Sequence, residues 1–345
     1  MRPTYCSRED VMSALDSKTT SNIDAIDRAI VAASDAIDGA MHRIFYPSRE
    51  TRYFDYPNYY SRSRTGELWL DDSELLSVET ITSGGVEILA GSYFLYPSNG
   101  KPYNRLALNR ATSASFTSGS TAQRSIVITG VYGYTDAETA AGALTAGMDA
   151  VQTTIQVSDS SAIGVGNLIR VGSERLVVTG KSLLDSGQQL QGSLGTQNNA
   201  VTVPVEDGSG FHVGEVILIG AERMLILDIA GDDLIVKRAV QGSVLNSHAL
   251  NDVVYVPRLL TVERGSVGTT AALHSNGAAI YRHTPPGLIQ ELCLAEAINT
   301  LEQQSSGYAR VIGSGDNQRE APGRGLNDIR SQAEAVYRRY RTAAI

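Results

Sequence analysis

The chain has 345 residues, 42% of them apolar and 19% charged, which predicts a globular protein of two domains and excludes a disordered one. A net charge of −8 argues against a protein that grips nucleic acid through phosphate contacts. The two cysteines, Cys6 and Cys293, exclude a disulfide framework, and no apolar run reaches the roughly 18 residues of a membrane helix. The N-terminus lacks the apolar core of a signal peptide, so we expect a reducing compartment and no membrane.

The first elements in the chain are predicted to be helical. Ser7 and Asp10 fit a capping box, which predicts a short helix that includes Leu15. A longer helix is predicted from Ser21 to Ile44, because apolar residues recur there at spacings of three and four. The isoleucines of this stripe are Ile23, Ile26, Ile30, Ile37 and Ile44. We favour a core helix, and the same spacing also suits packing against a helix of another subunit.

The next stretch, up to Tyr134, alternates between short apolar runs and glycine turns. The predicted strands cover residues 51–55, 68–70, 77–82, 86–89, 93–96 and 125–134. Strands of this length at this spacing favour a small meander or sandwich over a βαβ sheet.

The middle of the chain contains an internal repeat. Residues 157–179 align without a gap on residues 205–227, at an offset of 48, and residues 234–255 match residues 260–281 at an offset of 26. If one repeat unit consists of a first and a second half, the chain contains both first halves (157–179 and 205–227) before both second halves (234–255 and 260–281). The simplest account is one complete unit inserted within another, which exposed loops with close ends tolerate.

Six charged or titratable residues recur in the repeat. They are Glu174, Arg175, Glu222, Arg223, His248 and His274. Each pair of neighbouring glutamate and arginine is predicted to form an ion pair that stabilises its module, and both histidines are predicted to be packing residues. A general acid–base role would require a second titratable group that converges on them, and the sequence indicates none.

The sequence contains no recognisable catalytic or cofactor motif. Gly180-Lys181-Ser182 lacks the earlier glycine of a phosphate-binding loop, since Arg175 stands at that position. No histidine has the spacing of a helical zinc site, and no serine lies in a nucleophile elbow. We therefore expect no enzymatic activity, no metal and no cofactor.

The chain ends in two predicted helices. Pro286 opens the first, which runs to about Gln304, and the second carries an apolar stripe from Leu326 to Tyr340. The basic residues at its end are Arg338, Arg339 and Arg341. They fit either a cationic helix cap or a tip that docks on an acidic partner.

A succession of short motifs outside the repeat resembles a known family. The motifs are Tyr-Cys-Ser-Arg-Glu-Asp-Val (5–11), His-Arg-Ile-Phe (42–45), Thr-Arg-Tyr-Phe-Asp (51–55), Leu-Trp-Leu-Asp (68–71), Leu-Ser-Val-Glu-Thr-Ile (76–81), Tyr-Gly-Tyr (132–134) and a helix opened by Pro286. In their order they resemble the head–tail connector, or adaptor, proteins of tailed bacteriophages. The resemblance covers about residues 1–134 and 285–345, and the block between them resembles small β modules appended to phage structural proteins.

The resemblance and the repeat together imply a fold class. We expect an α+β protein, in which residues 1–136 plus 285–345 form a helical adaptor domain with a small β meander. An all-β insertion at 137–284 interrupts that domain and holds two nested, related modules. The outer module is expected at 150–182 plus 258–283, and the inner module at 203–256.

The resemblance also implies a function. Adaptors of this family form a ring below the portal protein, extend the DNA channel and join head to tail. We therefore expect a virion protein of the neck, at the head–tail junction, assembled in the host cytoplasm into a homo-oligomeric ring that is twelve-fold by the family resemblance.

The expected partners of this ring are the portal, a neck or tail-terminator protein, and double-stranded DNA that passes without sequence recognition. The portal interface is expected at Tyr337, Arg338, Arg339, Tyr340 and Arg341. The alternative is another phage structural component, such as a baseplate or fibre-attachment protein, whose β modules bind a partner or a glycan.

Overall fold

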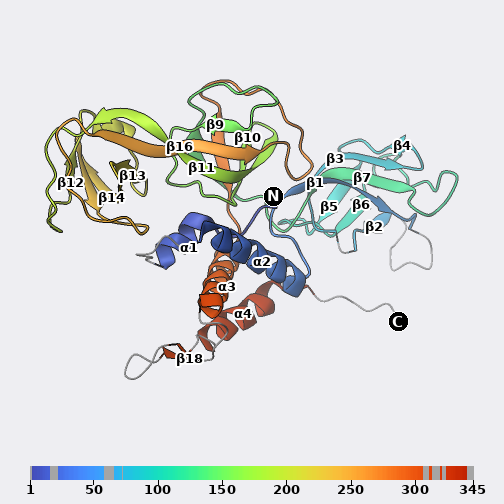
Figure 1. Ribbon diagram of the computed structural model, residues 1–345. Helices are drawn as coiled ribbons and strands as arrows, with labels where there is room; N and C mark the ends of the chain where they lie inside the picture. The colour runs from blue at the N-terminus through green and yellow to red at the C-terminus, as the bar shows by residue number, and fades with distance from the viewer. Residues whose placement is uncertain are drawn as a thin grey trace. The chain divides into compact units, whose positions relative to one another are not determined.

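The computed structural model describes residues 2–15, 22–57, 66–71, 73–305, 311–312, 319–320 and 324–339 (Figure 1). Contacts divide the chain into two compact units. The first unit combines Met1–Met41, Glu138–Ser266 and Thr270–Ile345, and the second combines His42–Ala137 and Val267–Thr269. This division groups the helical ends of the chain with the repeat. The domain boundaries expected from the sequence describe segments that fold independently, which is a different property from contact. These boundaries stay a prediction.

The protein is mostly β-sheet, with 36% strand, 20% helix and four α-helices in the described residues. The expected fold class, a helical adaptor domain with a small β meander, is wrong, because the strands belong to large antiparallel sheets. The cause of the error is physical. Each short strand carries only a few apolar residues and therefore gives a weak periodic signal. The long isoleucine stripe gives a strong one, so the pattern of the sequence favours helix over strand.

The four helices belong to the first unit and lie together in Figure 1. Their bounds are α1 Arg8–Ala14, α2 Ile23–Met41, α3 Gly287–Ser305 and α4 Arg324–Tyr337. The predicted capping box is confirmed, because the Asp10 amide donates to the Ser7 hydroxyl and the Ser7 amide donates to the Asp10 carboxylate. Between α3 and α4, the two-residue strands β18 Val311–Ile312 and β19 Arg319–Glu320 pair with each other.

The isoleucine stripe of α2 is largely buried within its own chain. Ile26, Ile30 and Ile37 are at most 3% exposed, and α2 packs against α3 and α4. Full burial of one such side chain contributes about 1.5–3 kcal/mol, so the stripe holds the helices together. Ile23, at the start of the helix, is 47% exposed. Packing of α2 against another subunit stays a prediction.

Ile44, the expected last member of the stripe, does not belong to the helix. Helix α2 ends at Met41, and the following His42 adopts a left-handed backbone conformation with φ of 55°. Ile44 lies in the second unit, where its carbonyl accepts a hydrogen bond from the Tyr134 amide at 2.9 Å.

The second unit holds two antiparallel sheets. One has the order β1 (Ser48–Phe54), β7 (Ile126–Tyr132), β3 (Leu75–Ser83), β4 (Val86–Glu87), and the other β2 (Glu67–Trp69), β6 (Arg105–Leu108), β5 (Tyr93–Tyr96). Leu70, Leu75, Leu106, Ile126 and Ile128 are among the buried side chains of one shared core. The six strands predicted for this stretch are confirmed, whereas β6 was not predicted.

The repeat forms a ten-stranded antiparallel sheet in the first unit. Its order is β12 (Thr202–Pro204), β15 (Asp233–Lys237), β14 (Glu222–Ala230), β13 (Val216–Ile219), β16 (Val253–Glu263), β11 (Glu174–Gln189), β10 (Leu168–Val171), β17 (Ala279–His283) and β8 (Glu138–Ala143), with β9 (Thr154–Gln156) paired to β16. A 3₁₀ turn spans Gly208–Gly210. Strands β11 and β16 pair from Val177 opposite Glu263 to Gln189 opposite Val253.

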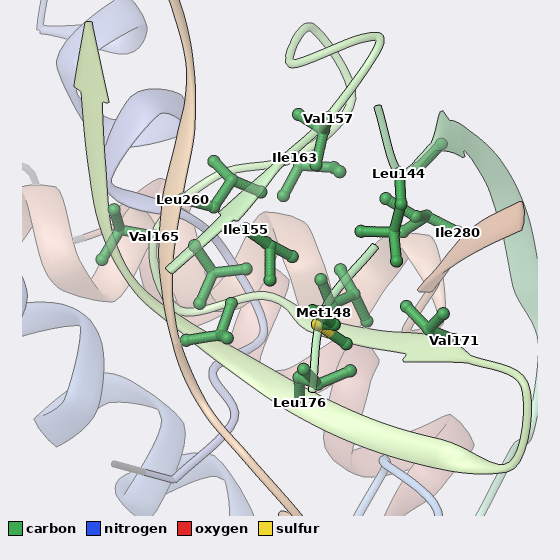
Figure 2. Packing of buried hydrophobic residues seen from close by; sticks show 14 residues of the cluster. Leu144, Met148, Ile155, Val157, Ile163, Val165, Val171, Leu176, Leu260 and Ile280 are labelled. Atoms are coloured by element: carbon green, nitrogen blue, oxygen red, sulfur yellow. The ribbon is translucent and has the colours of Figure 1, made fainter. Parts of the chain in front are cut away.

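Two separate cores form along this sheet. The outer core draws on residues 141–178 and 260–280, and Figure 2 shows its side chains, Leu144, Ile155 and Leu176 among them, converging between the strands. The inner core draws only on residues 190–256. In sequence, the inner core therefore lies between the two halves of the outer core. We call the structures around these cores the outer module and the inner module.

Candidate functional site

A buried carboxylate organises the outer module. Glu174, at the start of β11, is fully buried and accepts hydrogen bonds from Arg264 Nε (2.7 Å) and Nη2 (2.9 Å) and from His274 Nε2 (2.8 Å). The backbone amides of Gly265 and Ala272 donate to the same carboxylate, each at 3.0 Å. Five hydrogen bonds thus join the two halves of the outer module at one side chain.

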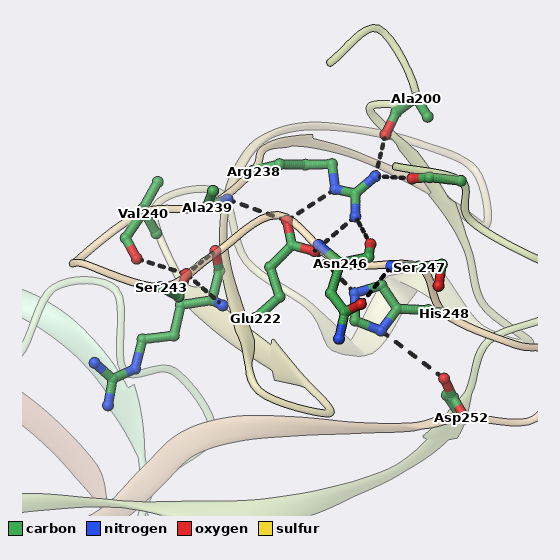
Figure 3. Close-up of polar contacts among 12 residues, drawn as sticks. Ala200, Glu222, Arg238, Ala239, Val240, Ser243, Asn246, Ser247, His248 and Asp252 are labelled. Atoms are coloured by element: carbon green, nitrogen blue, oxygen red, sulfur yellow. Dashed lines mark hydrogen bonds and ion pairs between the residues drawn. The ribbon is translucent and has the colours of Figure 1, made fainter. Parts of the chain in front are cut away.

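The inner module repeats this arrangement residue by residue (Figure 3). Glu222, at the start of β14, accepts from Arg238 Nε (2.9 Å) and Nη2 (2.6 Å) and from His248 Nε2 (2.9 Å). The amides of Ala239 and Asn246 donate at 3.1 and 3.0 Å. The two offsets found in the sequence relate the clusters: Glu222 follows Glu174 by 48 positions, and the residues that donate to Glu222 precede their outer-module counterparts by 26.

Both carboxylates are held in the charged form. Burial alone would raise the pKa of Glu174, but the hydrogen bonds from Arg264, His274 and two backbone amides outweigh it and lower the pKa to about 2. At Glu222, the same opposition between burial and hydrogen bonds, led by Arg238, also lowers the pKa. At neutral pH each carboxylate is therefore ionised, and donors of its own module occupy its oxygens. Each cluster joins segments of its own module by hydrogen bonds.

The predicted ion pairs between sequence neighbours are corrected by this geometry. Glu174 and Glu222 pair with Arg264 and Arg238, not with Arg175 and Arg223. Neighbouring side chains in a strand point to opposite faces, so a buried glutamate leaves the following arginine on the other face of the sheet. The structure does bring each glutamate together with its predicted repeat histidine, Glu174 with His274 and Glu222 with His248.

A third buried carboxylate ties the two modules to each other. Glu215 of the inner module is 1% exposed and accepts from Arg258 Nε and Nη2 at 2.8 and 2.5 Å. The amide and hydroxyl of Ser160, in the outer module, donate to it at 3.1 and 3.0 Å. No pattern in the sequence predicts this contact, because the repeat has Asn167 at the position equivalent to Glu215.

The two cysteines lie side by side although 287 positions separate them. Cys6 Sγ and Cys293 Sγ are 3.1 Å apart, both buried, and join the N-terminal segment to α3. Ser34 of α2 adds a contact to Cys293 at 3.4 Å and accepts from the Tyr5 amide at 3.2 Å. The hydrogen bond to Cys293 and burial raise the pKa of the Cys6 thiol well above its ordinary value, so this thiol is protonated and unreactive at neutral pH.

The expected portal-interface residues lie at and beyond the end of α4. Tyr337 is the last residue of the helix, and Arg338 Nη1 pairs with Glu334 one turn earlier at 3.3 Å. The Arg339 amide donates to the Met41 carbonyl at 3.0 Å, which attaches this end to α2. The other two expected interface residues, Tyr340 and Arg341, lie outside the described residues.

A pocket of about 450 Å³ lies between α1 and the inner module. The wall formed by the inner module includes Gly214, Val216, Leu218, Arg223, Leu225 and Lys237. The opposite side includes Arg8, Glu9 and Met12 of α1, together with Lys181 of β11. Lys181 Nζ donates to the carbonyls of Ser160 and Ile163 at 2.7 and 2.8 Å, and burial lowers its pKa. The pocket thus has an apolar and basic wall on the inner module.

The described residues contain no group of His, Cys, Asp and Glu side chains that could hold a metal ion. Among the helices described, none is both long enough and apolar enough to cross a membrane. Comparison of the chain with protein-family models, curated proteins and solved structures found no match.

Proposed function

We propose that this chain is a structural protein of a tailed-bacteriophage particle, a head–tail connector that forms a homo-oligomeric ring between the portal and the neck or tail. One observation carries the proposal. The two ends of the chain, whose motifs resemble that family in their order, are brought together by the packing of α2 on α3, and the repeat is inserted between them. The proposal rests on these terminal segments, because the sheets of the protein exceed what the family resemblance implies.

The buried clusters support a structural role without enzymatic activity. Glu174 and Glu222 each receive five hydrogen bonds from their own module, which leaves neither carboxylate available for acid–base chemistry. In this proposal the end of α4, with Arg338 and Arg339, contacts the portal, and the net charge of −8 lets DNA pass without adhering.

The test is inactivation of the gene in the virus that carries it, followed by electron microscopy of the lysate. A connector role predicts DNA-filled heads and separate tails, which join again when the chain is supplied in trans. Complete particles that merely fail to adsorb would contradict the connector role and support the alternative, a baseplate or fibre-attachment protein.

A second experiment tests the ring directly. The chain is co-expressed with the proteins encoded beside it, and the complexes are imaged. We expect a closed ring of this chain stacked on a larger ring with a common axis. A chain that stays monomeric with every co-expressed protein would refute the proposal. The variant Arg338→Glu, with Val244→Glu on the inner module as a matched control, tests the portal interface.

A further inference from the structure

The N-terminal segment of the chain covers one loop of the outer module. The Thr4 amide donates to the Gly166 carbonyl at 2.9 Å, and the Arg8 amide donates to the Val165 carbonyl at 3.1 Å. In return, the Val165 amide donates to the Glu9 carboxylate at 2.8 Å. An extended segment that enters a helix, with a carboxylate in the first helical turn, therefore caps this loop.

The inner module contains the same loop in the same backbone conformation. Gly214 is the repeat equivalent of Gly166, and their φ angles are 92° and 98°. Each glycine amide donates to the facing strand at matching positions, Gly214 to Ile226 at 2.9 Å and Gly166 to Val178 at 2.8 Å. The backbone donor and acceptors that receive the N-terminal segment on the outer module are therefore also present on the inner module.

On the inner module this loop is uncovered. Val165 is 1% exposed, whereas its equivalent Val213 is 54% exposed. Within the described residues, no protein group bonds to the amide of Val213 or to the carbonyl of Gly214. On the strand that follows the loop, Leu168 is 3% exposed in the outer module, whereas its equivalent Val216 is partly exposed and lines the pocket.

The charge of the uncovered surface indicates what it accepts. Arg223 and Lys237 line the pocket beside Leu218 and Leu225. At the position equivalent to Lys237, the outer module carries Glu263, so this part of the wall is basic only in the inner module. A basic and apolar wall, next to an exposed amide, is complementary to a carboxylate on a partly apolar segment.

We propose that the loop and strand face around Val213, Gly214, Val216 and Leu225 is a docking site for a partner protein. The occupant is an extended segment that leads into a helix and carries a carboxylate in its first turn. It would reproduce on the inner module the contacts that Thr4 to Glu9 make on the outer module.

A second copy of this chain is not the proposed occupant. Its own N-terminal segment is already engaged, because Thr4 and Arg8 bond to its outer module and Cys6 lies against Cys293. The occupant therefore comes from a different polypeptide. This inference does not depend on the proposed role in a phage particle.

The test uses the full chain and, as probe, a fluorescent peptide of residues 2–15 with Cys6→Ser, because this segment shows the required chemistry. We expect saturable binding in fluorescence anisotropy and slower hydrogen exchange at residues 211–218 in the complex. The peptide with Glu9→Gln should bind about tenfold more weakly, since it loses a hydrogen bond to a charged acceptor. The variant Val213→Asp should weaken binding by at least about tenfold, whereas Leu250→Asp, at an equally exposed residue of the same module that does not line the pocket, should not change it.

Three results would overturn the proposal. The first is no saturable binding up to about 1 mM peptide. The second is binding that Val213→Asp leaves unchanged, because the peptide would then replace the native segment on the outer module. The third is self-association of the chain that Val213→Asp abolishes, because a second copy would then be the occupant. Circular dichroism of both variants verifies that they fold.

Discussion

Replacing Glu222 with glutamine should weaken the inner module and leave the outer module intact. The substitution keeps the size of the side chain but removes the charge that neutralises Arg238, whose side chain is only 3% exposed. Leaving one member of a buried ion pair without its partner costs about 3–5 kcal/mol. Since about 1.4 kcal/mol corresponds to a factor of ten, the inner module should open locally roughly a hundredfold to several thousandfold more often.

Hydrogen exchange measured by mass spectrometry reports this opening strand by strand. Protection should fall in β13, β14 and β15 and stay unchanged in β10 and β17, because the two modules have separate cores. The matched variant Glu174→Gln should give the reverse pattern. In the double variant Glu222→Gln and Arg238→Met, part of the protection should return, since no buried charge is left unpaired. A loss below tenfold, or an equal loss in both modules, would refute the role assigned to these clusters.

Two further predictions concern pH and the N-terminal segment. Because the pKa of Glu174 is lowered to about 2 from the ordinary 4.5, its contribution to stability is present above pH 4.5 and lost as the pH falls toward 2. Urea unfolding measures this loss in the wild type, and the Glu174→Gln variant, which keeps Glu222, should lose less stability over the same pH range. An equal loss in both proteins would contradict the role of Glu174. Gly166 and Gly214 both have positive φ, so alanine costs about 1–2 kcal/mol at either position, but only at Gly166 would the new Cβ collide with Thr4. Trypsin should therefore cleave at Arg8 faster in Gly166→Ala than in Gly214→Ala, and equal rates would disprove the capping contact.

The sequence allowed some of these features to be predicted because they are local or periodic. The α2 stripe follows from the spacing of Ile26, Ile30 and Ile37, and the nested repeat from two constant offsets. Alignment of Arg238 with Arg264 was also visible in the sequence, and it marks the true partners of Glu222 and Glu174. The pairing itself was assigned to sequence neighbours because it depends on which face of a strand each side chain occupies.

Other contacts had no counterpart in any local pattern. The proximity of Cys6 and Cys293 results from the packing of helices at opposite ends of the chain. The hydrogen bond between Glu215 and Ser160 joins the two modules. The repeat does not predict it, because the outer module has Asn167 at the position equivalent to Glu215. The expected share of helix was too high, because the sequence of a single segment does not indicate pairing between distant strands, such as β11 with β16.

The pairing of β11 with β16, which extends over both modules with three register shifts, has a mechanical consequence. An inserted domain is usually attached by two flexible linkers and can swing on them. Here the two connections are strands hydrogen-bonded to each other, so a force on the inner module is transmitted through this strand pair to the outer module. The outer module receives the inner module between its two halves. An insertion of a third module between the halves of the inner module would lengthen the inserted block and leave the outer module unchanged.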